Sequence, residues 1–292
     1  MSAISSELVM NAAWFFASGW RRAWFALAMA VIALAGIRSA WWLTVERQRR
    51  WLTEASYPPP PEGMVLVPAG WFWMGTDNPE AAPDAQPLRR VFLPAFYIDR
   101  HEVTNAQFRA VFSEHTYPDG QDHVPVTGVL KGQAQAYANA VGRRLPTGAE
   151  WEKAARGTDG RQWPWGDEFR PECANVGRLT QTERLGLQER GISCAVLGPR
   201  LKVSVGSYPC GASPYGALDM AGNAWEWVAD VHVDERHWLD FRSPRIERGI
   251  LRGGAYGYGP DQARTWYQAF EGLETTCNDV GFRTALSAEP IR

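Results

Sequence analysis

Glycine and proline occur throughout the chain in numbers that limit how much regular secondary structure it can form. The 292 residues include 28 glycines and 20 prolines, and both residue types interrupt helices and strands. Nine of the 15 tryptophans lie beyond residue 60, where large rigid side chains suit a domain with irregular backbone. For most of these tryptophans, packing in the core or under turns is the simplest interpretation. The sequence therefore predicts a loop-rich globular domain.

A single apolar run lies near the N-terminus. Residues 23–37 carry no charge, and the run extends to residue 42 if Arg38 reaches back to the membrane surface, which gives about 28 Å of helix. That length just spans the hydrocarbon core of a bilayer. Tryptophans flank the run on both sides, as in an interfacial aromatic belt: Trp20, Trp24, Trp41 and Trp42. We therefore expect residues 23–42 to be a single-pass transmembrane anchor.

The charges around this run leave its orientation open. More arginines follow the run than precede it, which would keep the C-terminal part in the cytoplasm. Against this, Arg21 and Arg22 directly precede the apolar stretch and faintly resemble a twin-arginine export signal, and residues 33–35 offer a cleavage site. The interpretation we adopt is an uncleaved signal-anchor with a periplasmic or other extracytoplasmic domain.

The chain turns polar after the run and reaches four consecutive prolines, residues 58–61. Such a stretch is typical of a stiff polyproline spacer. The expected organisation is an N-terminal segment, an anchor, a Pro-rich linker, one domain and a short tail: residues 1–22, 23–42, 43–62, 63–288 and 289–292.

Beyond residue 63 the local patterns predict a few short helices and strands. Two capping boxes, Thr104–Gln107 and Thr147–Glu150, predict helices to about residue 112 and up to Gly157. A third helical face is formed by Ala134, Tyr137, Ala138 and Val141, closed by Gly142. Short strands are expected at residues 65–68, 96–98 and 251–254. The predicted fold class is α+β.

Several blocks of this domain resemble the formylglycine-generating enzyme (sulfatase-modifying factor) family. They occur in the family's order between about residues 64 and 286: MVLVPAGWFWMG from Met64, DRHEVTNAQF from Asp99, RLPTGAEWEKAARG from Arg144, WPWGD from Trp163, YGALDMAGNAWEW from Tyr215, RGG from Arg252 and VGFR from Val280. In the third block, Gly148 replaces a usual glutamate. The resemblance implies an elaborated C-type-lectin-like fold.

The resemblance also indicates which chemistry is missing. Oxygen-dependent members of that family bind copper(I) through two cysteines, a soft-ligand pair that suits Cu(I). The first of these positions falls on Tyr258 and the second on Ala263, and a usual upstream serine is Ala255. Iron is not expected either, because the related iron-dependent enzymes use three histidines, and this chain has no comparable histidine pattern. A solvated polar loop is a simpler interpretation than a metal cluster for the two histidines near Asp230, Asp234 and Glu235, which are His232 and His237.

Calcium is the cofactor that the resemblance favours. Its implied ligands are Asp219, the carbonyls of Gly222 and Ala224, and Glu226, all hard oxygen donors. The alternative is that Glu226 pairs with an arginine, such as Arg252 or Arg283. A second calcium site would begin at Asn175 and Val176, but its distal half is missing from the divergent segment 177–202.

The resemblance places Trp225 in a substrate groove, so a cleft floored by aromatic side chains and one arginine is a further expectation: Trp225, Tyr256, Tyr258, Arg264 and Trp266. Such a surface suits an extended peptide or a planar or anionic group. Packing under the C-terminal loop is the competing interpretation.

Four cysteines, Cys173, Cys194, Cys210 and Cys277, have no C-x-x-C spacing, which excludes a zinc ribbon or thioredoxin motif. In an oxidising compartment they allow two disulfides, and we expect at least one. A net charge of −2 without a basic stripe argues against nucleic acid as a partner.

Three functions stay open on the sequence. The first is an anchored accessory, maturation or binding factor for an envelope protein or peptide, without cysteine–copper chemistry. The second is an oxidoreductase of the same superfamily that uses a different site to modify a peptide or small molecule. The third is a purely structural envelope protein, so whether the chain is an enzyme is left undecided.

Overall fold

The computed structural model describes residues 42–177, 202–233 and 246–291. The chain separates into two units, residues 1–51 and 52–292. Within the described residues, no helix is both long and apolar enough to cross a membrane. Nearly all of the stretch expected as an anchor lies outside these residues.

The part of the expected linker that belongs to the second unit is attached to the domain. Tyr97 donates a hydrogen bond from its hydroxyl to the carbonyl of Pro58 at 2.8 Å, and the backbone of Ile291 donates to Ser56 at 2.8 Å. Leu52 and Tyr57 pack against a small core cluster. The proline stretch therefore starts on the domain surface, and residues 42–54 are helical.

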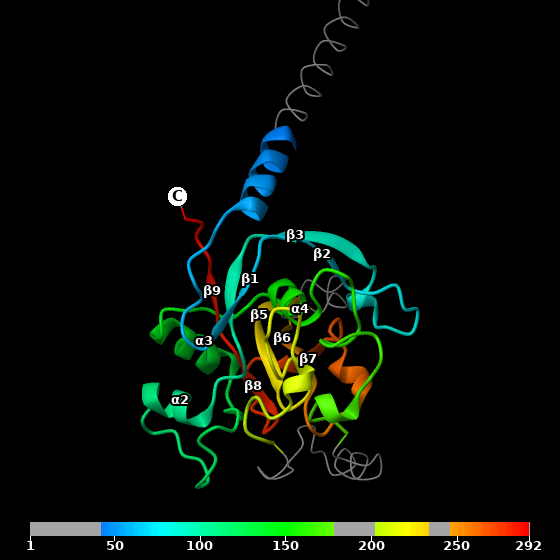
Figure 1. Cartoon of the computed structure of the whole chain (residues 1–292). Helices are drawn as coiled ribbons and strands as arrows, with labels where there is room; N and C mark the ends of the chain where they lie inside the picture. The colour runs from blue at the N-terminus through cyan, green and yellow to red at the C-terminus, as the bar shows by residue number, and fades with distance from the viewer. Residues whose placement is uncertain (1–41, 178–201, 234–245, 292) are drawn as a thin grey trace, which may run out of the picture. The chain divides into compact units, whose positions relative to one another are not determined.

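Three small sheets form the framework of the domain (Figure 1). The first has the order β1-β4-β9, with antiparallel strands Met64–Val67, Phe96–Asp99 and Ala285–Ser287. The second is a hairpin of β2 (Gly70–Met74) and β3 (Arg89–Leu93). The third has the order β7-β6-β5-β8: Ala269–Gly272, Glu247–Arg252, Trp225–Val233 and Val280–Phe282. In this sheet β5 and β8 run parallel, so residues 225–227 lie beside residues 280–282.

Three α-helices and several 3-10 turns complete the described domain. The helices are α2 (Asn105–Val111), α3 (Lys131–Ala140) and α4 (Gly148–Arg156), and the turns are η1 (Pro83–Ala85), η2 (Pro171–Cys173), η4 (Pro209–Gly211) and η6 (Pro260–Ala263). Both predicted capping boxes are confirmed: Thr104 and Gln107 cap α2, and Thr147 and Glu150 cap α4. The mixed α+β class is therefore confirmed.

Two local predictions were wrong. Val141 was placed on the buried face of its helix, but it is the residue that ends α3 and is 36% exposed. The strand predicted over residues 251–254 ends at Arg252, because Gly253 and Gly254 adopt φ values of +94° and +75°, which a strand cannot contain.

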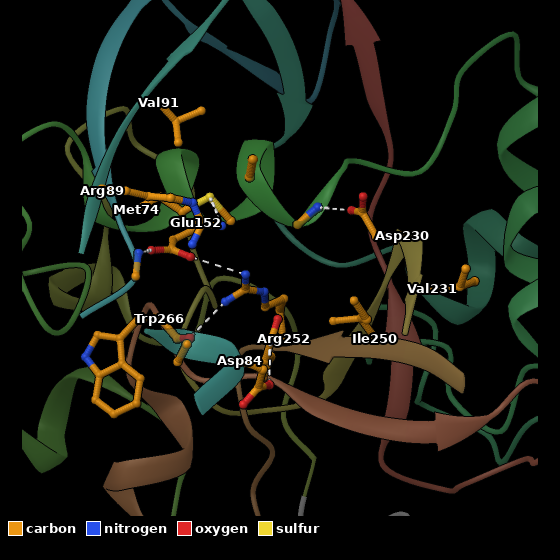
Figure 2. A pocket seen from close by; sticks show the side chains of 15 residues that line it. Met74, Asp84, Arg89, Val91, Glu152, Asp230, Val231, Ile250, Arg252 and Trp266 are labelled. Carbon is orange, nitrogen blue, oxygen red and sulfur yellow. Dashed lines mark hydrogen bonds and ion pairs between the residues drawn. The ribbon is translucent and has the colours of Figure 1, made fainter. Parts of the chain in front are cut away.

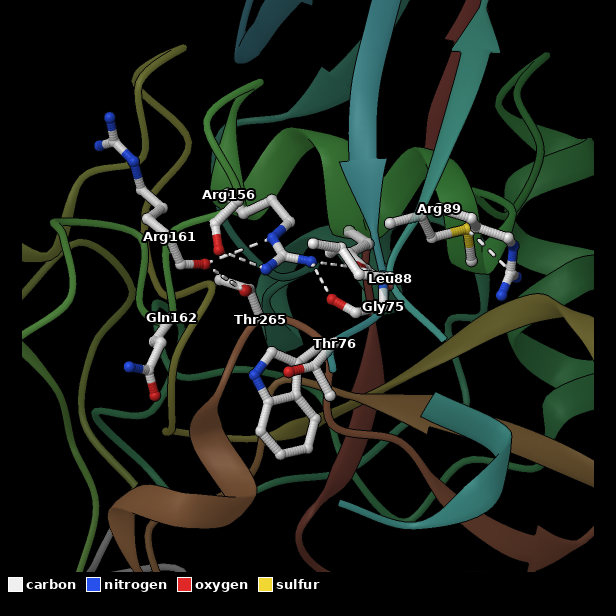
Figure 3. Close-up of polar contacts among 12 residues, drawn as sticks. Gly75, Thr76, Leu88, Arg89, Arg156, Arg161, Gln162 and Thr265 are labelled. Atoms are coloured by element: carbon white, nitrogen blue, oxygen red, sulfur yellow. Dashed lines mark hydrogen bonds and ion pairs between the residues drawn. The ribbon is translucent and has the colours of Figure 1, made fainter. Parts of the chain in front are cut away.

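Helix α4 buries more polar surface than its sequence suggested. Trp151, Ala154 and Ala155 face the core as predicted, but Glu152, Lys153 and Arg156 are each only 1% exposed. Arg156 donates to the carbonyls of Gly75 and Gly160 and to Glu152, so its charge is held among fixed acceptors (Figure 3). These contacts attach α4 to the end of β2.

Candidate functional site

The loop before β5 is held in a conformation that only a few residues tolerate. Asp219, Gly222 and Asn223 have φ values of +56°, +84° and +65°. A Cβ on Gly222 would lie 2.4 Å from the carbonyl oxygen of Asn175, so a glycine is required there. Asn175 also donates from its side chain to that of Asn223 at 3.1 Å. This loop is therefore packed against Asn175 and Val176 and hydrogen-bonded to Asn175.

Glu226, at the start of β5, is paired with Arg283. The guanidinium donates to both carboxylate oxygens, from Nε at 2.6 Å and from Nη2 at 2.7 Å, and both side chains are 0% exposed. The indole of Trp151 donates to Glu226 Oε2 at 2.7 Å. Of the two arginines considered from the sequence, Arg283 is the partner, while Arg252 pairs with Glu152. Both oxygens of Glu226 are thus engaged within the protein.

Two more buried carboxyl groups, Glu102 and Asp219, lie near this pair. Glu102 is 0% exposed, and its Oε1 has no hydrogen-bond partner in the described part of the chain. Burial, with Asp219 and Glu226 nearby, raises the pKa of Glu102, and burial also raises that of Asp219. Three buried carboxyl groups therefore share the Arg283 guanidinium, and burial disfavours the ionised forms of Glu102 and Asp219.

This arrangement bears on the expected calcium site. The structure brings Asp219, Gly222, Ala224 and Glu226 together in one loop and strand, and an excess of buried carboxylate oxygen suits a hard cation. Asp219 Oδ2 accepts from the backbone of Gly206 at 2.6 Å. The described residues contain no group of three or more His, Cys, Asp or Glu side chains arranged to hold a metal. A cation here would therefore depend on the backbone carbonyls and on oxygens that Arg283 leaves accessible.

Tyr258, which the resemblance places at the family's first copper-ligand position, is a hydrogen-bonded tyrosine. The Tyr258 hydroxyl bonds to the Asp279 carboxylate and to Trp225, whose ring lies edge-on to the phenol at 5.4 Å between centroids. Burial raises the pKa of Tyr258, so the phenol is neutral at ordinary pH. The second position, Ala263, is fully buried and packs against Gly254.

Asp279 is the residue of this site that sequence reasoning missed. It is 1% exposed, its Oδ2 has no hydrogen-bond partner among the described residues, and burial raises its pKa to about 6. Lys202, which donates to Thr127, is near enough to stabilise the Asp279 carboxylate, and burial lowers the Lys202 pKa to about 8. The sequence signal was an aspartate directly before the VGFR block. Its proximity to Tyr258 depends on β8 lying beside β5.

The five side chains expected in a cleft lie in two places. Trp225, Tyr256 and Tyr258 lie around Asp279, and Trp225 and Tyr256 are only 3% and 0% exposed. Arg264 and Trp266 lie on the far side of Tyr267, and the Arg264 guanidinium covers the rings of Trp163 and Trp266 at 4.8 and 5.7 Å. Tyr267 connects the two groups, with ring centroids 6.0 Å from Trp225 and 6.4 Å from Trp266.

The remaining predicted residues have the following positions. Cys173 is joined to Cys210 by a disulfide, which confirms the expectation of at least one, and Cys277 is also disulfide-bonded. Cys194 lies outside the described residues, as do Asp234, Glu235 and His237, whereas Asp230 is described and accepts from the backbone of Gly148. Asn175 and Val176 lie against the loop at Gly222, and the ring of His232 packs on Phe270 at 4.3 Å.

The family model and the similar sequences found by comparison with known proteins agree on one family. A family model described as "Sulfatase-modifying factor enzyme 1-like domain" matches residues 52–288. The formylglycine-generating enzyme of Bos taurus is 28% identical over 294 residues, covering 80% of this chain and 77% of that protein. The "Inactive C-alpha-formylglycine-generating enzyme 2" of Bos taurus is 26% identical, covering 77% of this chain and 88% of that protein.

Among solved structures, PvdO from Pseudomonas aeruginosa has the same fold. It superposes with a TM-score of 0.60 at 24% identity, covering 80% of this chain and 98% of PvdO. The expected lectin-like, mixed α+β architecture agrees with this similarity.

Proposed function

The chain belongs to the sulfatase-modifying factor enzyme 1-like family, and we propose that it is a binding or maturation factor for an envelope protein rather than a copper-dependent oxidase. The observation that carries this proposal is the state of Tyr258. Its phenol, at the position where the resemblance expects the first copper-ligand cysteine, is hydrogen-bonded to Asp279 and Trp225.

The donor set at this position does not match Cu(I). Cu(I) prefers thiolates, whereas Tyr258 offers a neutral phenol and Ala263 no donor at all. Cys173, Cys210 and Cys277 are in disulfides. One relative, whose name describes it as inactive, aligns with a similar share of this chain. This similarity supports a protein that keeps the fold of the family but does not carry out the oxidase reaction.

Two further features belong to this proposal. Residues 23–42 would anchor the protein in a membrane, with the domain on the extracytoplasmic side, where the Cys173–Cys210 disulfide is stable. Calcium, bound by Asp219, the carbonyls of Gly222 and Ala224, and a shared Glu226, would neutralise the excess of buried carboxylates and stiffen the loop.

The copper part of the proposal is tested by restoring the thiolates. The purified chain should bind no stoichiometric Cu(I) and should not convert the cysteine of a sulfatase-derived peptide to formylglycine. The variant Tyr258→Cys with Ala263→Cys should gain one equivalent of Cu(I). Formylglycine formation by the unmodified chain would overturn the proposal.

The partner is best sought by photo-crosslinking from the loop beside Tyr258. A photoreactive residue at Asp261, whose side chain is 77% exposed, should capture one envelope protein. The same residue at Glu80, an exposed position elsewhere on the domain, is the matched control. Equal capture from both positions would contradict partner binding at this loop.

A second candidate function, an oxidoreductase with different chemistry, is favoured by one observation. Asp279, with a pKa of about 6, contacts the Tyr258 phenol and lies near Lys202, a set of groups that can exchange protons near neutral pH. Stoichiometric iron or copper in the purified protein would favour this function. A purely structural protein would show neither bound redox metal nor a captured partner.

A further inference from the structure

A pocket of about 440 Å³ opens between the β2–β3 hairpin, the N-terminus of α4 and the end of β6. Its walls are partly apolar, with Met74, Val91, Ile250 and Trp266 among the lining side chains (Figure 2). The guanidinium of Arg252 lies on this pocket, between Glu152 and the carbonyl of Trp266. The pocket thus combines apolar side chains with charged groups, among them the Arg252 guanidinium.

Glu152, Asp230 and Asp84 together offset the charge of Arg252, but one N–H group of its guanidinium lacks an acceptor within the described residues. Glu152 serves two buried arginines: its Oε1 accepts from Arg156 at 2.7 Å and its Oε2 lies 3.2 Å from Arg252 Nη2. Arg252 is 2% exposed, and its Nε has no hydrogen-bond partner within the described residues. A buried guanidinium N–H without an acceptor costs free energy that a ligand oxygen would recover.

Gly148 leaves room for such an acceptor. A Cβ at this position would lie 3.4 Å from Asp230 Oδ2, 3.5 Å from Arg252 Nη2 and 3.7 Å from Arg252 Nε, all ordinary contact distances. Because glycine has no side chain, nothing from α4 reaches the unpartnered nitrogen. The backbone N–H of Gly148 is already bonded to Asp230 at 2.5 Å, so the donor available to a ligand is Arg252 and not the helix terminus.

The remaining charges limit the kind of anion that can bind. Asp84 and Asp230 line the same pocket, and Arg89 is the other cation at its wall (Figure 2). Asp84 is held by Gln268 at 2.5 Å. Two carboxylates at the edge disfavour a dianion such as phosphate by like-charge repulsion, but they tolerate a single negative charge placed against Arg252.

We propose that this pocket binds a monocarboxylate with an apolar body, whose carboxylate accepts hydrogen bonds from Arg252 and whose body packs against Met74, Ile250 and Trp266. This site is separate from the Tyr258–Asp279 region and goes beyond the function proposed above. It would bind its ligand whether or not the chain has a protein partner.

The test uses the purified full chain and titration by ligand-observed NMR with phenylacetate. Saturable binding of phenylacetate is expected, with phenylacetamide, its neutral isostere, bound about tenfold more weakly or worse, because a hydrogen bond to the charged guanidinium is lost. Inorganic phosphate should not compete. Equal binding of the acid and the amide, tighter binding of phosphate, or no binding of phenylacetate would each overturn the proposal.

A matched pair of variants locates the site. Gly148→Glu supplies a carboxylate next to Arg252 and should reduce phenylacetate binding about tenfold or more. Gly132→Glu adds the same charge in α3, where no atom lies within 4 Å of the new Cβ, and should leave binding unchanged. Retained binding in Gly148→Glu would overturn the proposal. If that variant does not fold by circular dichroism, the comparison of acid and amide in the unmodified chain decides.

Discussion

Arg283 donates two hydrogen bonds to Glu226, at 2.6 and 2.7 Å, and neither side chain is exposed to solvent. The same guanidinium donates to the carbonyls of Asp99, Arg100 and Leu218. One side chain therefore connects β8 to β5, to the end of β4 and to the loop before Asp219. Its charge also offsets the buried carboxyl groups of Glu102 and Asp219.

Arg283→Gln should destabilise the domain by about 3–5 kcal/mol, because it leaves the Glu226 carboxylate buried without its counter-charge. The free energy of unfolding, measured by urea denaturation at pH 7, checks this value. Arg109→Gln is the matched control, since Arg109 and its partner Asp122 are about half exposed, and it should cost about 1 kcal/mol or less. Similar losses for both variants would mean that the buried pair contributes no more than a surface pair.

Asp279→Asn should stabilise the domain at neutral pH. The pKa of Asp279 rises on folding from 3.8 to about 6, so the folded state holds its proton more tightly than the unfolded state does. The protonated Asp279 side chain therefore leaves the folded state fully stable below pH 4. As the pH rises through 6 the side chain ionises, and the folded state loses about 3 kcal/mol of stability. In urea denaturation, the free energy of unfolding of the variant should increase relative to that of the wild type as the pH rises from 4 to 7. A constant difference across this pH range would contradict the proposed burial of a carboxylate.

Tyr258→Phe should raise the pKa of Asp279 above its value in the wild type, because the phenol hydrogen bond stabilises the ionised carboxylate. The shift can be followed by carbon-13 NMR of the aspartate carboxyl groups during a pH titration. Tyr57→Phe removes a hydroxyl that bonds to the carbonyl of Leu52 and should leave Asp279 unchanged. An unchanged or lower pKa in Tyr258→Phe would show that this hydrogen bond is absent in solution.

Gly222→Ala should destabilise the domain by about 3 kcal/mol or more. Alanine at φ +84° is strained, and its Cβ would lie 2.4 Å from the carbonyl oxygen of Asn175. Gly132→Ala, within α3 and without neighbours, should instead stabilise by about 0.5–1 kcal/mol. Thermal unfolding of both variants tests the contrast, and a tolerated alanine at position 222 would mean that the loop relaxes.

Local patterns predicted the helices well because their determinants are local. The side chains of Thr104 and Thr147 accept from backbone groups three residues away, so a four-residue motif is sufficient. The same local reasoning failed at Val141, where the helix ends before the apolar side chain can reach the core. It also missed Glu152 and Arg156, since burial of charged groups depends on acceptors such as Gly75 that lie far away in the sequence.

The sequence alone established the family blocks, the α+β class and the absence of cysteines at Tyr258 and Ala263, because each of these is a matter of residue identity and spacing. Only the tertiary structure decided that Glu226 pairs with Arg283 and that Asp279 meets Tyr258. Ion pairs and hydrogen bonds form between groups a few ångströms apart, and the parallel pairing of β5 with β8, which no local pattern encodes, brings these groups into reach.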